Sequence, residues 1–119
     1  MATVQRLTRT ADFAAARREG RSWSDNVLVL IARPNGLGVS RAGYSVGKRV
    51  GNAVVRNRAK RRLRESVRGS HIEKGWDLVF IARKDASDAD FHTLDRSVTA
   101  LVERAGVVER PHTTPISRA

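Results

Sequence analysis

The residues best suited to chemistry in this sequence are the cations of the stretch GNAVVRNRAKRRLRE, which covers residues 51–65. Six arginines and lysines fall within nine positions, from residue 56 to residue 64, and apolar residues recur between them. Guanidinium groups bind phosphate through paired hydrogen bonds, and ammonium groups bind it as point charges. The stretch therefore predicts a folded surface that binds a polyanion, rather than a site that makes or breaks bonds.

The net charge of the chain is concentrated in the same region. The formal net charge of the 119 residues is +11, and residues 48–68 contribute +8 of it, with nine basic residues and one acid, Glu65. Like charges four positions apart on a helix repel each other by roughly a few tenths of a kcal/mol per pair. An anionic partner is the economical explanation for this repulsion, and nucleic acid is the leading candidate.

Other kinds of site have little support in the sequence. The chain has no cysteine, which excludes disulfides, thiol catalysis and thiolate metal sites. Its three histidines lack the spacing of metal ligands. Asp85, Asp88 and Asp90 could bind a divalent ion, but they are better explained as acids that complement the positive end of the following helix. We find no signal peptide and no apolar run near the roughly 20 residues of a membrane span.

Hydrophobic patterning predicts the order helix, strand, strand, helix, strand, helix, with room for a short extra strand at 21–23. The first helix is expected after Thr10, whose hydroxyl would cap it, and should stop at Gly20 in a left-handed conformation. Apolar runs predict strands at 27–32, 37–46 and 76–82. The turn residues 34–36 suggest that the first two strands form an antiparallel pair.

The basic stretch is predicted to form a helix that begins near Ala53 and is capped by Asn52. At ~100° per residue, four apolar residues form a core-facing stripe about 120° wide. The stripe consists of Val55, Ala59, Leu63 and Val67. The cations flank it on both sides, with Arg56, Lys60 and Arg64 on one side and Arg58 and Arg62 on the other.

A last amphipathic helix is predicted, with its cap at Ser87 and Asp88 and its end at Gly106. Its buried side is expected to carry Phe91, Leu94, Val98, Leu101 and Val102. The fold class is then α+β, an α/β sandwich, with three helices and a small, mainly antiparallel sheet of about four strands. The helical connection between strands 38–46 and 76–82 allows them to lie parallel, and on general grounds that crossover should be right-handed.

The sequence predicts one RNA-binding domain over residues 1–119, with an ordered core at about 6–108 and a disordered tail at 110–119. Within it, AGYSVGKRVGNAVVRNRAKRRLRE at 42–65 resembles the signature of the bacterial ribonuclease P protein subunit. The family hallmark, Arg-Asn-Arg, is found here as Arg56, Asn57 and Arg58. RLTRTADFAAARREGRS at 6–22 and DLVFIARKDAS at 77–87 resemble the family in order and spacing, so the resemblance covers residues from about 6 to 105.

The resemblance implies a protein subunit that assists a catalytic RNA. In this family the RNA, together with Mg²⁺, hydrolyses the bond between the 5′ leader and the precursor tRNA, and protein side chains do not catalyse the step. The implied partners are the catalytic RNA subunit and precursor tRNA, with no membrane partner and with a monomeric protein in a cytoplasmic ribonucleoprotein. Mg²⁺ would be held mainly by RNA, with none bound by the protein alone. The resemblance also implies a left-handed crossover, against the general rule.

Two sets of site residues follow from the resemblance. The family's central helix faces the RNA subunit, which assigns RNA contacts to Lys48, Arg49, Asn52, Arg56, Asn57, Arg58, Lys60, Arg61 and Arg64. The family holds the single-stranded leader in a cleft between the sheet, the first helix and the central helix, to which Phe13, Arg17 and Ile31 are assigned. Phe13 would stack on a base. Arg17 and Ile31 stand where relatives often carry aromatics, which predicts weaker stacking and stronger phosphate contact through Arg17.

Two alternatives remain open at this level. A small ribosomal or general RNA-binding protein with no role in cleavage would share the basic α/β sandwich. A protein-only nuclease would use Asp85, Asp88 and Asp90, and would cleave RNA without an RNA component.

Overall fold

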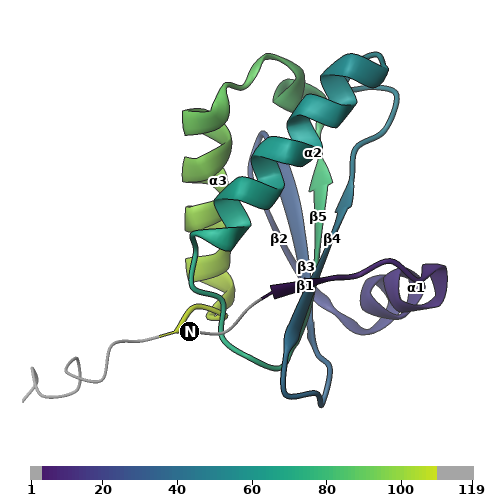
Figure 1. Ribbon diagram of the computed structural model, residues 1–119, viewed down its shortest axis with the longest axis vertical. Coiled ribbons are helices and arrows are strands. Elements are labelled where there is room, and N and C mark those ends of the chain that lie inside the picture. The colour runs from purple at the N-terminus through teal and green to yellow at the C-terminus, as the bar shows by residue number, and fades with distance from the viewer. Residues whose placement is uncertain (1–3, 110–119) are drawn as a thin grey trace, which may run out of the picture.

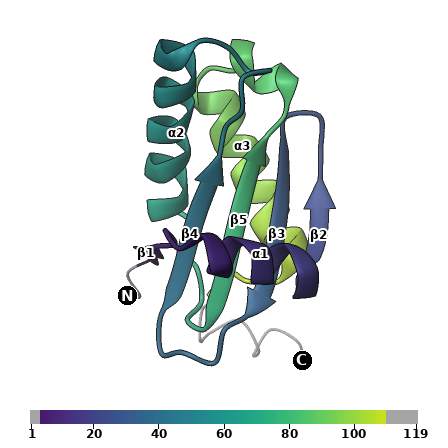
Figure 2. The ribbon, with the colours of Figure 1, turned by 90° about the vertical axis from the view of Figure 1, so that its right-hand side faces the viewer.

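The computed structural model describes residues 4–109 (Figure 1). Two long helices cover one face of a five-stranded sheet, and a short helix crosses the other face (Figures 1 and 2). The elements in chain order are β1 (Val4–Arg6), α1 (Thr10–Glu19), β2 (Arg21–Ser24), β3 (Leu28–Pro34), β4 (Ser40–Ser45), α2 (Ala53–Arg68), β5 (Trp76–Ala82), the 3-10 helix η1 (Lys84–Asp88) and α3 (Phe91–Ala105). The predicted tail at 110–119 lies outside the described residues.

The sheet is mixed, with the strand order β1-β4-β5-β3-β2. β4 pairs in parallel with β1 and β5, whereas β3 pairs in an antiparallel manner with β5 and β2. The predicted α+β class is confirmed, but the sheet has five strands and is not mainly antiparallel. The predicted pairing of the second and third strands, β3 and β4, is wrong because β5, buried from Asp77 to Phe80, lies between them and pairs with both.

The connection from β4 through α2 to β5 is left-handed. In Figure 2, α1 faces the viewer, β4 and β5 run upward, and β5 lies to the right of β4. α2 shares a core with α3 on the far face, so the chain returns behind the sheet while it moves to the right (Figure 2). The family resemblance therefore predicted the handedness correctly, and the general rule for such crossovers did not.

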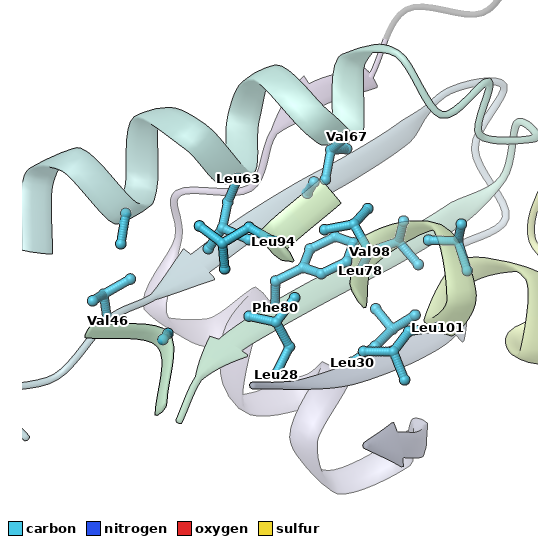
Figure 3. Close-up of a cluster of buried hydrophobic side chains, with 14 of the residues drawn as sticks. Leu28, Leu30, Val46, Leu63, Val67, Leu78, Phe80, Leu94, Val98 and Leu101 are labelled. Carbon is cyan, nitrogen blue, oxygen red and sulfur yellow. The ribbon is translucent and has the colours of Figure 1, made fainter. Parts of the chain in front are cut away.

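The main core lies between the sheet and the two long helices (Figure 3). Leu28 and Leu30 of β3, with Leu78 and Phe80 of β5, meet α2 and α3 and have no exposed surface. The predicted stripe of α2 is confirmed in its buried part, which consists of Ala59, Leu63 and Val67. Val55 at the start of the stripe is half-buried. One face of α2 thus anchors the helix, and its remaining faces are available to other partners.

A second, smaller apolar cluster attaches α1 to the opposite face of the sheet. Its buried members are Leu7, Ala16 and Val79, with Phe13, Ile31 and Ile81 packed partly buried around them. Ala16 is the one buried residue of α1. The apolar contact between α1 and the sheet is therefore thin.

The ends of α1 differ from the prediction. Arg9 occupies the N-cap position without a side-chain hydrogen bond, and Thr10 is already helical, so the predicted Thr10 cap is wrong. Gly20 is extended, with φ of −82°, and not left-handed. Glycine is needed here because there is no room for a side chain. A Cβ at this position would lie 2.5 Å from the carbonyl oxygen of Ala16 and 2.7 Å from Cγ2 of Ile31.

The caps of the two long helices were predicted with mixed success. The side-chain oxygen of Asn52 accepts the N–H of Val55 at 3.0 Å, which confirms the cap of α2. The cap of α3 is Asp90, which accepts the N–H of Thr93 at 2.8 Å. Ser87 and Asp88 lie in η1 instead, because one more short turn separates them from α3.

The C-terminal end of α3 and most of its buried side match the prediction. α3 ends at Gly106, as predicted, and this glycine is in the left-handed region, with φ of 74°. Leu94, Val98, Leu101 and Val102 are buried, but Phe91 is 39% exposed because it opens the helix at the surface. Within residues 4–109, no helix is long and apolar enough to cross a membrane.

Candidate nucleic-acid interface

Helix α2 lies along the β4 edge of the sheet (Figure 2), and none of its cations is among its buried residues. Asn57 and Arg61 are exposed. The remaining cations predicted to contact RNA on this helix are half-buried, and they are Arg56, Arg58, Lys60 and Arg64. Long basic side chains can cover apolar surface while their charged heads stay in water.

These cations lack acidic partners within the described part of the chain. On α2, only Arg68 lies near a carboxylate, 4.0 Å from Glu65. The buried Nε of Arg56 has no hydrogen-bond partner there. Arg62 differs from its neighbours, because its Nη1 donates to the carbonyl oxygen of Ala89 at 3.0 Å and ties α2 to the segment before α3. The charge of α2 is therefore left for an external anion.

The basic surface continues past the start of α2. Lys48 and Arg49 are exposed in the loop that leads into the helix, next to the capping residue Asn52. Arg49 shares a surface hollow of about 360 Å³ with Arg83 and Lys84. Arg83 and Lys84 were not predicted as RNA contacts, although they stand in the segment that resembles the family. Their position beyond the end of β5 becomes informative only when β4 and β5 are known to be neighbours.

A groove lies between α1 and α2, over the outer edge of β4. Two adjoining hollows of about 520 and 350 Å³ form it, and both contain Thr8, Phe13, Tyr44 and Lys60. We call them together the α1–α2 groove. Its other lining residues are Arg6, Leu7, Thr10, Ala14, Arg17, Gly43, Ser45, Val46 and Arg64. Aromatic rings and cations from four elements, β1, α1, β4 and α2, thus line the groove.

The groove exists because β1 is short. β1 pairs with Ser40–Ala42 of β4, and the N–H of Leu7 makes the next hydrogen bond, to the carbonyl oxygen of Ala42, at 2.9 Å. The chain then leaves the sheet toward α1. Beyond Ala42, no described strand covers the outer edge of β4, and this edge forms the floor of the groove.

Phe13 supplies an aromatic wall of the groove. Its ring packs against Gly43 so closely that a Cβ at residue 43 would lie 2.3 Å from Cζ of Phe13. Glycine at this position therefore lets the ring approach the backbone of β4. Arg17 lies one helical turn further along α1 and lines the same hollow.

Tyr44 is a groove residue that the sequence analysis missed. Its ring stacks on Phe80, with 5.9 Å between ring centroids and 15° between ring planes. Burial raises the pKa of Tyr44 to about 12, against the opposing charges of Arg64, Arg6 and Arg68. The ring therefore stays a neutral phenol that can stack or donate a hydrogen bond. Its place within the segment AGYSV, at the start of the family signature, was the available signal.

Ile31, the third residue assigned to the cleft, lies elsewhere. It is on β3 and packs half-buried with Leu7, Ala16 and Val79 beneath α1. It is not among the residues that line the α1–α2 groove. The structure thus brings Phe13 and Arg17 together in the groove and places Ile31 in the packing that supports α1.

A buried carboxylate organises the charges beneath α1. Asp77 of β5 is fully buried and accepts hydrogen bonds from Arg41 at 2.8 and 2.7 Å and from Asn35 at 2.9 Å. Burial alone would raise the pKa of Asp77, but the hydrogen bonds from Arg41 and Asn35, with the charges of Arg41 and Arg33, lower it below its ordinary value. Asp77 is therefore held as an anion inside the protein.

The aspartates considered as metal ligands do not assemble into a site. Asp90 uses its carboxylate to cap α3, and Asp85 and Asp88 are exposed in η1. Between residues 4 and 109, no three His, Asp or Glu side chains lie close enough together to hold a metal ion.

Comparisons with known proteins agree with this geometry. A family model described as Ribonuclease P matches residues 1–106, which include α2 and the α1–α2 groove. The chain is 42% identical over 108 residues to the ribonuclease P protein component of Caldanaerobacter subterraneus, with 89% of this chain and 93% of the relative covered. It is 46% identical over 112 residues to the ribonuclease P protein component of Roseiflexus castenholzii, with 92% of this chain and 92% of the relative covered. The solved RNase P protein of Staphylococcus aureus matches with a TM-score of 0.81 and 33% identity, over 90% of this chain and 100% of that chain.

Proposed function

The chain belongs to the ribonuclease P protein family, and from this premise we propose that α2 and the α1–α2 groove bind two different RNAs of one holoenzyme. Its role is that of the protein subunit of ribonuclease P, which processes the 5′ ends of tRNA. The observation that carries the proposal is the adjacency of two unlike surfaces. A helix rich in cations borders a groove with two aromatic rings, and Lys60 and Arg64 belong to both.

The surface of α2 suits the backbone of a structured RNA. Within residues 4–109, its cations from Arg56 to Arg64 make a row without acidic partners. Phosphate contacts of this kind supply affinity without reading sequence. We assign this surface to the catalytic RNA subunit. The docking residues are Lys48, Arg49, Asn52, Arg56, Asn57, Arg58, Lys60, Arg61 and Arg64, and Arg83 and Lys84 extend the surface beyond the sheet.

The α1–α2 groove suits a single strand. Unpaired bases can stack on aromatic rings, and Phe13 and Tyr44 offer two rings beside the free edge of β4. Arg6, Arg17 and Lys60 stand around these rings and can bind the phosphates between the bases. We assign the groove to the 5′ leader of precursor tRNA.

Hydrolysis itself is assigned to the RNA subunit. Mg²⁺ held mainly by RNA would activate the attacking water and stabilise the leaving oxygen. One copy of the protein belongs to each ribonucleoprotein. It holds the leader and neutralises phosphate charge, so that the substrate and the catalytic RNA associate at a lower ion concentration. We place this particle in the cytoplasm, with precursor tRNA as substrate.

Reconstitution with the RNA subunit tests the proposal. The protein should lower the Mg²⁺ concentration needed for cleavage, and it should bind leader-bearing precursor tRNA more tightly than mature tRNA when part of the holoenzyme. Equal affinity for both substrates, with no effect on cleavage by the RNA alone, would overturn it. Sedimentation with ribosomal subunits instead would point to the general RNA-binding alternative, and cleavage without RNA would point to a protein-only nuclease.

A further inference from the structure

The position of α1 shapes the groove, but the apolar packing of this helix is too small to fix that position. α1 carries Phe13 and Arg17, but it buries only Ala16 in its small cluster with Leu7 and Val79. In Figure 2 the helix crosses the sheet strands on the face opposite to α2 and α3, where it is the only helix of the described residues. A helix held by so little apolar surface needs another constraint to keep one orientation.

Two chains of charged groups supply that constraint, and both start from Asp77. In the first, Arg41 of β4 bonds to Asp77 at 2.7 Å and reaches Asp12 in the first turn of α1 at 3.4 Å. In the second, Arg33 of β3 lies 3.6 Å from Asp77 and bonds to Glu19 at the end of α1 at 2.6 Å. Through these two arginines, the buried carboxylate of Asp77 is linked to both ends of α1.

The inner part of this arrangement is fixed more firmly than the outer part. Arg33 and Arg41 keep 20% and 22% of their side-chain surface exposed, and Asp77 keeps none. The amide of Asn35 bonds to Asp77 and, at 3.1 Å, to the carbonyl oxygen of Val39, which fixes the carboxylate from a third direction. The two arginines are thus oriented by the sheet before they reach α1.

We propose that the chains Asp77–Arg41–Asp12 and Asp77–Arg33–Glu19 are a positioning device that sets α1 against β4 and so shapes the groove for the leader. Asp12 directly precedes Phe13 in α1, so the first chain holds the ring at its own turn of the helix. Glu19 fixes the other end, which prevents α1 from rotating about the first contact. This inference rests on the proposed function of the groove, because the shape it sets matters only for a ligand bound there.

Simple electrostatics makes the opposite prediction for the same residues. Replacing an acid of a protein with net charge +11 should strengthen RNA binding in general, whether or not a leader is present. A positioning role should instead weaken the preference for leader-bearing substrate. The ratio of the dissociation constant for mature tRNA to that for precursor tRNA separates the two effects, because general charge effects act on both substrates.

The variants Asp12→Asn, Glu19→Gln and their combination should be measured in the reconstituted holoenzyme. We expect the ratio to fall by about fivefold or more in the double variant, and by less in each single variant. Asp12→Glu, which keeps the carboxylate, should retain most of the ratio. Glu103→Gln on α3 is the matched charge control, because Glu103 is exposed and forms no ion pair within residues 4–109. It should leave the ratio unchanged.

A wild-type ratio in a double variant that folds and melts like the parent would overturn the inference. A loss in Glu103→Gln equal to that in the double variant would also overturn it, because net charge would then be the cause. If the wild-type holoenzyme binds precursor and mature tRNA equally well, the proposed function of the groove is wrong. This result comes from the wild type alone, so it is distinct from a failure of the inference, which is read from the variants. The single variants keep the test valid if the double variant does not fold.

Discussion

Phe13 and Gly43 are in direct contact, with the ring of one against the backbone of the other. A Cβ at residue 43 would lie 2.3 Å from Cζ and 2.7 Å from Cε1 of Phe13, which is closer than side chains approach each other. The wall and the floor of the α1–α2 groove are therefore one packing unit. Changes on β4 must alter the position of a ring on α1.

Gly43→Ala should displace Phe13 from the groove. We expect the free energy of unfolding to fall by about 1–3 kcal/mol, as for other overpacked sites. Leader affinity should fall by up to the roughly 1–3 kcal/mol that a base–aromatic stack contributes. Chemical denaturation and binding of leader-bearing substrate measure the two effects. Gly38→Ala is the control, because a Cβ at residue 38 meets no atom within 4 Å, and both quantities should stay near wild type.

Arg61→Ala should reduce the salt dependence of binding to the RNA subunit. Arg61 is exposed on α2, and each lost phosphate contact lowers the slope of log affinity against log salt by about 0.7–0.9. The slope is read from binding curves over a range of salt concentrations. Arg104→Ala on α3 removes the same charge from a residue that bonds to the carbonyl oxygen of Ser24, and should leave the slope unchanged. Equal slopes in wild type and Arg61→Ala would show that Arg61 is only solvated.

Leu63→Ala should destabilise the fold without removing a charge. Leu63 is fully buried between α2 and the sheet, and deletion of such a side chain costs about 2–5 kcal/mol. Val54→Ala on the same helix, at a residue that is 71% exposed, should change the free energy of unfolding by less than about 0.5 kcal/mol. Urea unfolding compares them. Similar losses in both variants would contradict the assigned face of α2.

Acid should destabilise the protein through Asp77 and Asp25. Burial opposes the lowered pKa of Asp25, but hydrogen bonds from Ser97, Leu28 and Val27 outweigh it. With a lowered folded pKa, the unfolded chain takes up the proton first, near pH 4, so the stabilisation present above that pH is lost as the pH falls further. Unfolding free energies between about pH 6 and pH 3 should decline. Asp25→Asn should start lower and decline less steeply, whereas a parallel decline would exclude Asp25 as a contributor.

Tyr44 can be titrated without ambiguity because it is the only tyrosine of the chain. Burial raises its pKa to about 12, so tyrosinate absorbance in the folded protein should appear near that pH. The raised value also means that the folded state loses stability as the pH rises above about 10, the ordinary pKa of tyrosine. A transition near pH 10 in protein that is still folded would show that the ring is solvated rather than stacked on Phe80.

Much of the local structure could be predicted because its causes are local. The apolar run at 76–82 matches β5, Asn52 caps α2, and Gly106 ends α3, since each of these depends on residues within one turn or one strand. The stripe of α2 followed from helical spacing alone. The caps of α1 and α3 were misplaced because no side chain caps α1, and because the short helix η1 separates Ser87 and Asp88 from α3.

The arrangement of the strands could not be predicted in the same way. The turn after β3 suggested a hairpin with β4, but β5 separates the two strands, and this insertion depends on contacts between distant parts of the chain. The same insertion brings Asp77 between Arg33 and Arg41, and Arg83 near Arg49. Tyr44 was missed for a related reason, since its exposure to the groove requires that β1 end early.

The two separate apolar clusters imply two levels of resistance to opening. The cluster shared by α2, α3 and the sheet includes most of the large buried side chains, whereas the cluster under α1 has few. Amide protons of α1 should therefore exchange with solvent through local opening, at a free energy well below that of global unfolding. Leader binding would slow this exchange, so deuterium uptake along α1 offers a direct record of when the substrate strand is held.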